Sequence, residues 1–167
     1  MVLLKSYRYP SGMTNQYTIR RATSEDLEEL LPLLPELTDF EVPERRNPDD
    51  LWTGDAALMK QALIEGLEET FVDVAEGKDG IMGFVMITMR EELMSHAPSA
   101  HLETIIVAPA ARGTGLGRTL LRHTEETAKQ RGAQSLSLHV FRNNRRAHAL
   151  YEAEGFDSEL IRAIKWF

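Results

Sequence analysis

A glycine-rich turn is the segment of this sequence best suited to hold an anion. It runs from Val107 to Arg118, between an apolar run typical of a strand and a periodic segment typical of a helix. Glycines let the backbone approach a ligand closely with unpaired N–H groups, and the N-terminus of the following helix adds partial positive charge. Arg112 and Arg118 flank the turn with side-chain charge. The chemistry predicted here is the binding of a phosphate or a pyrophosphate.

Three phosphate-binding patterns compete for this turn. A P-loop requires G-x-x-x-x-G-K-[ST], but Arg112 stands five positions before Gly117, and Arg118 follows that glycine. The dinucleotide fingerprint G-x-G-x-x-G also fails, because Arg118 occupies the third glycine position and no acid stands near His139. The pattern Arg-x-x-Gly-x-Gly is met by Arg112, Gly115 and Gly117. A turn that only connects a strand to a helix is the alternative without a ligand.

The elements that must position this turn follow from the spacing of apolar residues. The order β-α-α-β-β-β-α-β-α-β predicts an α/β (α+β) fold with a mixed sheet and helices on its faces. Pro32 and Pro35 should kink or end the first helix. We expect one domain over residues 1–167, in which 1–16 are a candidate extra edge strand and loop. The expected strands are 17–21, 70–76, 81–89, 101–107, 136–140 and 158–167, and the expected helices are 24–34, 53–69, 115–131 and 145–154.

The composition excludes several classes of function. The chain of 167 residues has no cysteine, which rules out disulfides, thiol catalysis and cysteine-ligated zinc. No apolar run reaches the ~18 residues that a membrane-spanning helix needs. A net charge of −7 argues against a general nucleic-acid binder. We therefore expect a soluble, cytoplasmic protein that binds neither membrane nor nucleic acid.

Charge is distributed unevenly along the chain. Residues 24–80 hold seventeen acids and four bases, whereas residues 110–150 hold eight bases and two acids. A basic segment in an acidic protein favours a local anionic ligand. Two solvated helix faces of opposite sign would give the same counts.

A second motif carries a resemblance to a known family. The segment from Asn144 to Phe156 resembles the N-x-x-A-x-x-L-Y-E-x-x-G-F signature of the GNAT (GCN5-related N-acetyltransferase) superfamily, and Arg112–Gly117 resembles that family's pyrophosphate-binding motif. Both motifs stand in the family's order, with one helix and one strand between them. The strong similarity covers His101 to Phe156. It implies a GNAT-like, mostly antiparallel sheet with helices on both faces and splayed parallel strands at its centre.

The resemblance implies an N-acetyltransferase that takes acetyl-CoA, or another acyl-CoA, as donor and an amine as acceptor. Coenzyme A is a polyanion, which suits the basic segment and the glycine-rich turn. Backbone N–H groups near Ile106 and Val107 are implied to contact the pantetheine or the thioester carbonyl, where a fixed donor would stabilise the oxyanion. The implied cofactor-binding residues are Ile105, Ile106, Val107, Arg112, Gly113, Thr114, Gly115, Leu116, Gly117, Arg118, Asn144 and Tyr151.

Acyl transfer to an amine poses two proton problems. The departing thiolate benefits from a general acid, and Tyr151, whose equivalent in the family lies near the sulfur, fits that role. The amine must lose a proton, and Glu103 on the central strand and His139 on the next strand compete as the base. A water chain without a dedicated base is a further alternative. Without these roles, Tyr151 is a buried packing residue, Glu103 a strand-edge ion pair and His139 a polar residue opposite Leu138.

Strict alternation along the central strand would place Glu103, Ile105 and Val107 on one face. The other four histidines show no metal-ligand spacing, so we expect them at the surface and expect no metal. These are His96, His101, His123 and His148.

The acceptor is the least constrained part of the prediction. An acidic stretch with Asp39, Glu41 and Asp55 would attract a cationic amine, although it is equally typical of a solvated surface. The acceptor class therefore stays open between a small molecule and a protein N-terminus or lysine. A homodimer is an expectation from the family alone. A non-catalytic CoA-binding sensor is the main alternative function, and a dinucleotide-binding enzyme is the third.

Overall fold

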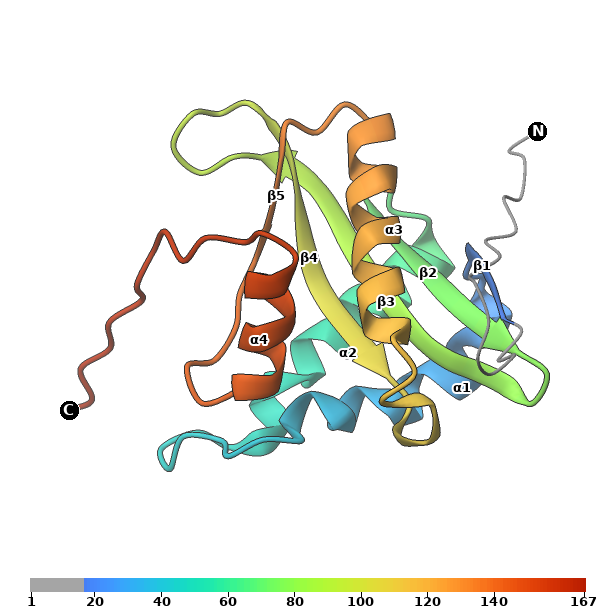
Figure 1. Ribbon diagram of the computed structural model, residues 1–167, viewed down its shortest axis with the longest axis horizontal. Coiled ribbons are helices and arrows are strands. Elements are labelled where there is room, and N and C mark those ends of the chain that lie inside the picture. The colour runs from blue at the N-terminus through green and yellow to red at the C-terminus, as the bar shows by residue number, and fades with distance from the viewer. Residues whose placement is uncertain (1–16) are drawn as a thin grey trace.

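The computed structural model describes residues 17–167, which form a twisted sheet with helices packed on both sides (Figure 1). The strands are β1 (Thr18–Arg21), β2 (Thr70–Gly77), β3 (Gly80–Glu91), β4 (Pro98–Val107) and β5 (Ser135–Leu138). The α-helices are α1 (Leu27–Leu30), α2 (Thr53–Lys60), α3 (Leu116–Gln130) and α4 (Arg145–Ala153). Short 3-10 turns are η1 (Ser24–Asp26), η2 (Leu31–Thr38), η3 (Pro48–Leu51) and η5 (Pro109–Ala111), and η4 (Gln61–Glu65) is a π turn.

The sheet has the strand order β1-β2-β3-β4-β5 and is antiparallel except at one pair. β4 and β5 run parallel, and their register extends from Ser99 opposite Ser135 to Leu102 opposite Leu138. Beyond Leu102, β4 continues to Val107 without a β5 partner. The predicted mixed, mostly antiparallel sheet with one pair of parallel strands is confirmed, but among the described residues this pair lies at one edge of the sheet and not at its centre, because β5 is the last strand in the order.

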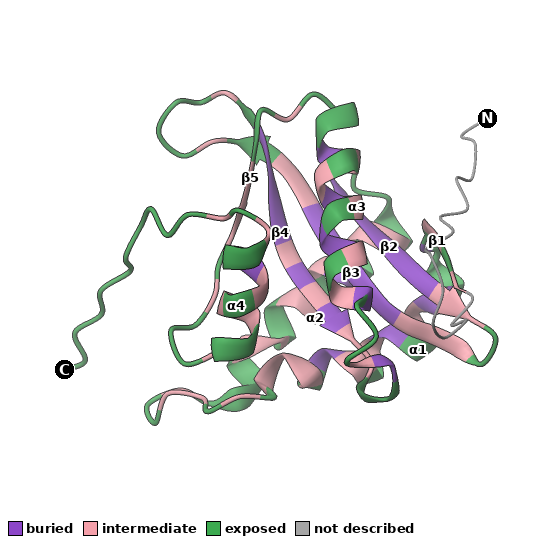
Figure 2. Ribbon diagram, in the orientation of Figure 1, coloured by how far each residue is buried: buried purple, intermediate pink, exposed green. Residues whose placement is uncertain are grey.

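Two apolar cores lie on opposite faces of this sheet (Figure 2). One forms between the sheet and the helices α3 and α4, where Leu120 and Leu121 are fully buried. The other forms between the sheet and the α1, η2 and α2 segment, where Leu30 and Met59 are fully buried. Gly83 lets α3 pack closely, because a Cβ there would lie 2.6 Å from the Ile106 carbonyl oxygen and 3.2 Å from a Leu120 methyl. Helices on both faces are therefore confirmed.

Proline and a helix bulge shape the N-terminal helical segment. Pro32 stands in the first turn of η2 and Pro35 within it, and the chain there tightens from α-helix to 3-10 helix. Because proline offers no N–H to the preceding turn, this change is the break that the sequence predicts. The second helix, expected as one element over 53–69, ends its α part at Lys60 and widens into the π turn η4 before Gly66.

The C-terminal strand that we expected over Ser158–Phe167 is wrong. These residues form neither helix nor strand, and the chain leaves the body of the molecule after α4 (Figure 1). Leu160, Ile161 and Trp166 are exposed. Apolar content alone predicted this strand, but a strand also needs a neighbouring edge to satisfy its N–H and C=O groups.

Three smaller points complete the description of the fold. β5 ends at Leu138, two residues before the expected end of that strand. The candidate edge strand in residues 1–16 lies outside the described residues. Within residues 17–167, no helix is long and apolar enough to cross a membrane.

Candidate functional site

A row of unpaired backbone N–H groups connects β4 to α3. Gly113 and Gly115 have φ angles of +76° and +86°, a conformation that side chains rarely adopt, and Gly115 is the N-cap of α3. From Gly113 to Arg118, no backbone N–H donates to another group of residues 17–167. The first such bond of the helix runs from the Thr119 N–H to the Gly115 carbonyl. This row, which we call the amide cradle (residues 113–118), combines free donors with the positive end of a fifteen-residue helix.

Nearby side chains hold the amide cradle in place. The Thr114 hydroxyl donates to the Ala111 carbonyl at 2.7 Å, and Leu116 is buried in the α3 core. A Cβ on Gly117 would lie 3.6 Å from a Val107 methyl and 3.7 Å from a Leu150 methyl. The cradle therefore lies over the end of β4 and beside α4.

The arginines that flank the amide cradle are bound to carboxylates. Arg112 donates at 2.6 Å to both Glu36 and Asp39 of the η2 segment, and its Nε donates to the Val107 carbonyl at 3.2 Å. Arg118 lies 2.7 Å from a carboxylate oxygen of Glu154, at the end of α4. The acidic and basic segments of the sequence thus neutralise each other in part, and the free donors of the site are backbone groups.

Asn144, at the N-terminus of α4, and the C-terminal part of β4 offer further hydrogen-bonding groups. The Asn144 side-chain oxygen caps α4 by accepting from the Ala147 N–H at 3.1 Å, while its amide nitrogen bonds to no other group of residues 17–167. Ile105 and Val107 pack toward α3 and Ile106 toward the α2 face. Between Glu103 and Val107, the β5-facing edge of β4 has no strand partner.

Tyr151 lies at the centre of the α3 core. It is 8% exposed and packs in the same cluster as Leu102 and Leu116, with the Phe156 ring 5.7 Å away. Burial raises the pKa of its phenol to about 12, so the hydroxyl keeps its proton at neutral pH. No hydrogen bond joins this hydroxyl to another group of residues 17–167.

Glu103 is the extra residue of a β-bulge. Thr104 pairs with Met86 and Leu102 with the next residue of β3, so Glu103 has no partner. The alternation that groups Glu103 with Ile105 and Val107 is therefore wrong. The bulge shifts the phase of the strand by one residue. Glu103 instead lies near His101, with a carboxylate oxygen 3.9 Å from the His101 Nε2.

Titratable groups from three elements gather around this bulge. The rings of His101 and His139 meet edge to face with centroids 4.6 Å apart. From α2, Asp55 accepts a hydrogen bond from the Thr104 hydroxyl at 2.8 Å. Burial and, to a lesser extent, the charge of Glu103 raise the pKa of Asp55, although the Thr104 hydrogen bond opposes that rise. The structure thus brings together the two candidate bases, Glu103 and His139, with a second carboxyl group, that of Asp55.

His101 is a site residue that the sequence analysis missed, and Asp55 was named there only as one acid of a stretch that would attract a cationic amine. The prediction that His101 lies at the surface is wrong, because it is 2% exposed. His101 stands two residues before Glu103 on the same strand, and residues two apart share a face of a sheet. That spacing could have predicted that His101 lies near the candidate base. Asp55 offered no such signal, because only the packing of α2 on the sheet brings it to Thr104.

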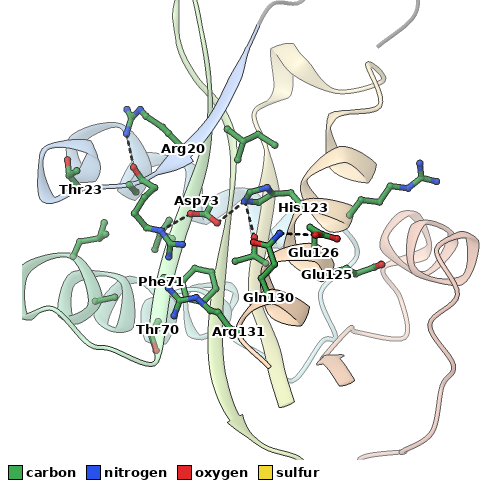
Figure 3. A pocket seen from close by; sticks show the side chains of 18 of the residues that line it. Arg20, Thr23, Thr70, Phe71, Asp73, His123, Glu125, Glu126, Gln130 and Arg131 are labelled. Carbon is green, nitrogen blue, oxygen red and sulfur yellow. Dashed lines mark hydrogen bonds and ion pairs between the residues drawn. The ribbon is translucent and has the colours of Figure 1, made fainter. Parts of the chain in front are cut away.

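A large hollow of about 1230 Å³ lies elsewhere, between the β1–β2 edge and α3 (Figure 3). Its lining includes Phe71, with the guanidinium groups of Arg21 and Arg131 each 4.1 Å from the ring centroid. Asp73 and His123 form a pair beside it (Figure 3). None of the residues of the amide cradle lines this hollow. The hollow is therefore separate from the turn, the bulge and the tyrosine described above.

The mixed sheet with one parallel pair of strands and helices on both faces, together with the glycine-rich turn at the start of α3, defines an α/β fold. A model of the Acetyltransferase (GNAT) family matches residues 27–156. The chain belongs to this family and is a GNAT-type acetyltransferase. Members of the family generally use acetyl-CoA.

Relatives of this chain carry N-acetyltransferase names. It is 30% identical over 141 residues to the uncharacterized N-acetyltransferase YhfO of Bacillus subtilis (strain 168), covering 84% of this chain and 90% of that protein. It is 26% identical to the aminoalkylphosphonate N-acetyltransferase of Salmonella typhimurium, covering 88% and 89% of the two chains. A crystal structure of a transcriptional regulator from Bacillus halodurans C-125 aligns with a TM-score of 0.71 at 25% identity, covering 91% of this chain and all of that one.

Proposed function

We propose that this protein transfers an acetyl group from acetyl-CoA to a primary amine by direct transfer in a ternary complex. One observation carries the proposal: a continuous row of N–H groups without a partner among residues 17–167 lies at the end of β4, whose β5-facing edge is likewise unpaired in that part of the chain. A diphosphate needs several donors at once, and the amide cradle supplies them without a side chain. The pantetheine arm is then expected along β4 between Ile105 and Val107, with the free amide nitrogen of Asn144 beside it.

The arginines of the turn take a supporting role in this proposal. Arg112 ties the turn to Glu36 and Asp39, and Arg118 ties the start of α3 to the end of α4 through Glu154. Their charge still raises the local potential that attracts a polyanion, but the direct contacts come from residues 113–118.

The proposed reaction requires proton transfers at both nitrogen and sulfur. The amine nitrogen attacks the thioester carbon, a C–N bond forms and the C–S bond breaks. A primary ammonium gives one proton to the base before attack, and its nitrogen loses a second proton to solvent as the C–N bond forms. The departing sulfur receives a proton from the Tyr151 hydroxyl, which solvent then reprotonates, so the net reaction releases one proton. The products are an amide and free CoA. With no cysteine in the chain, the protein has no thiol to carry the acetyl group between donor and acceptor.

Glu103 is the preferred base. It sits in the bulge of β4 with 22% of its side chain exposed, so an amine or a water molecule can reach it. His139 is the competing base, because its ring lies against His101 on the same side of the bulge. Asp55 adds a negative group close by, which favours a cationic acceptor such as a primary ammonium.

A CoA-binding sensor without turnover is the second candidate function. The likeness to a structure named as a transcriptional regulator favours it. A sensor needs the amide cradle but has no need of a protonated phenol in the apolar core or of a carboxylate in the bulge. The presence of both Tyr151 and Glu103 supports the enzyme.

Release of free CoA tests the two candidates. Thiol-reactive dye reports CoA without background, because the protein itself has no cysteine. We expect acetyl-CoA to bind in calorimetry and at least one primary amine from a panel of polyamines, amino acids, aminoalkylphosphonates and peptides to drive thiol release. Binding without release for every amine would support the sensor. Absence of binding would refute both.

A further inference from the structure

The buried histidine of the bulge makes an unusual contact with an arginine. The Nδ1 atom of His101 lies 2.7 Å from an Arg90 Nη2 on β3 and 2.8 Å from the Ser137 hydroxyl on β5. His101 itself is fully enclosed between these strands, at 2% exposure. Arg90 is exposed and therefore reaches in from the surface to meet the ring.

This contact fixes which nitrogen of His101 carries the proton. A guanidinium has only N–H donors and no acceptor, so the Nδ1 atom that meets Arg90 must offer its lone pair. A neutral imidazole with an accepting Nδ1 carries its proton on Nε2. Burial, together with the smaller effects of the charges of Arg90 and His139, lowers the pKa of His101 to about 4, which agrees with a neutral ring.

The Nε2 side of the ring faces the candidate base. The Nε2 atom lies 3.9 Å from a Glu103 carboxylate oxygen, which is longer than a hydrogen bond. Such contacts in ligand-free sites often tighten when the substrate binds. The charged and titratable groups that face His101 and its partner are Arg90 from β3, Glu103 from β4, His139 after β5 and Asp55 from α2.

We propose that Arg90 and His101 are positioning residues: Arg90 holds His101 in the Nε2–H tautomer, and His101 directs that N–H at the Glu103 carboxylate. The carboxylate is thereby held in the bulge as a proton acceptor. The catalytic consequence rests on the proposed function, whereas the tautomer is a property of the protein alone. The other tautomer would turn a lone pair toward Glu103 and repel it.

Nuclear magnetic resonance of the free protein tests the first step. Long-range nitrogen–proton correlations of the His101 ring should show the Nε2–H tautomer, unchanged from pH 8 to about pH 5. Arg90→Met should populate the Nδ1–H tautomer and let the ring titrate at higher pH. Arg142→Met, which removes an exposed arginine elsewhere, should change neither property. An Nδ1–H tautomer in the unaltered protein would overturn the proposal, whether or not the protein is an enzyme.

Kinetics with two amide variants test the second step. Glutamine at position 101 is long enough to place an N–H where the histidine Nε2–H stands, whereas asparagine reaches only the Nδ1 position. We expect His101→Gln to keep kcat within about threefold and His101→Asn to lose roughly tenfold, with the KM for acetyl-CoA unchanged in both. The low-pH limb of the kcat profile should shift only in His101→Asn.

Each outcome separates the two proposals. Equal kcat values for the folded glutamine and asparagine variants would overturn the positioning role, since a purely structural histidine has no preference between them. An Nε2–H tautomer in a protein that transfers acetyl to no amine would refute the proposed function and leave the Arg90–His101 contact standing.

Discussion

Two histidines of this protein lie against carboxylates on the same sheet, and they differ in where the nearest arginine binds. His123 on α3 places its Nε2 2.9 Å from Asp73, and the same carboxylate lies 3.0 Å from the Nε of Arg21. His101 on β4 lies 3.9 Å from Glu103, but here the arginine, Arg90, meets the histidine instead.

The position of the arginine decides what the carboxylate can do. Asp73 is buried and bound by two donors, Arg21 and His123, which occupy its carboxylate oxygens. Glu103 has no side-chain donor within hydrogen-bond distance among residues 17–167, and part of its surface is exposed. The first pair stabilises the packing of α3 on β2, whereas the second leaves a carboxylate available for chemistry.

Neutralising each carboxylate in turn tests most directly whether Glu103 serves catalysis and Asp73 serves stability. We expect Glu103→Gln to lower kcat by roughly 100- to 1000-fold with little loss of stability, because it removes the proton acceptor. Asp73→Asn should leave kcat within about threefold and lower the free energy of unfolding by about 1–2 kcal/mol, since the partly exposed donors Arg21 and His123 would then meet a weaker partner at a buried position. Thiol-release kinetics and urea unfolding measure the two effects.

His139→Gln is the control for the competing base. If it lowers kcat by as much as we expect for Glu103→Gln while Glu103→Gln has no effect, then the base is His139. Small effects of both substitutions would leave a water chain as the route for the proton.

The next largest effect is expected from the hydroxyl of Tyr151. Tyr151→Phe should lower kcat by roughly 100-fold and leave the affinity for CoA unchanged, because the proton for the departing sulfur is lost while the packing remains. Tyr17→Phe removes a hydroxyl from the lining of the large hollow between the β1–β2 edge and α3, and it should change neither value. Unchanged turnover in Tyr151→Phe would remove this residue from the mechanism.

The burial of His101 also predicts how the stability of the protein changes in acid. Burial of the His101 ring lowers its pKa to about 4, so the unfolded chain takes up a proton near pH 6.5 that the folded protein does not. Stability that depends on His101 is therefore present above pH 6.5 and is lost as the pH falls toward 4. We expect His101→Gln to gain about 3 kcal/mol relative to the unaltered protein between pH 7.5 and 4, measured by urea unfolding. A constant difference would show that His101 has the same pKa in the folded and the unfolded protein, and would contradict this prediction.

Much of the scaffold followed from local signals in the sequence. The turn at Gly77–Gly80 predicted the hairpin of β2 and β3, and the periodic apolar residues before Gly132 predicted α3. These signals worked because hairpins and amphipathic helices are determined by nearby residues. The amide cradle was also predictable, since two glycines with positive φ are required by the backbone itself.

The parts that failed depend on distant neighbours. The expected strand at Ser158–Phe167 lacked a partner edge, and the bulge at Glu103 arises from the pairing of β4 with β3. The burial of His101 and its contact with Arg90 likewise require three strands to be aligned. The sequence of one segment does not say which residues of the neighbouring strands it pairs with. The face of the sheet on which Glu103 lies could therefore not be predicted.

The smallest effect is expected from a pair of glycines at the two ends of α3. Gly115 and Gly132 have nearly equal φ angles of +86° and +89°, and a Cβ at either would meet nothing within 4 Å. Valine at either position should therefore cost similar stability, but only Gly115→Val disturbs the amide cradle. We expect the KM for acetyl-CoA to rise about tenfold in Gly115→Val, which corresponds to the loss of one charge-assisted hydrogen bond, and to stay unchanged in Gly132→Val. Equal KM values in two folded variants would place the diphosphate away from residues 113–118. Acetyl-CoA would then not be held beside Glu103 by the amide cradle, and Glu103 could not act on its acetyl group as proposed.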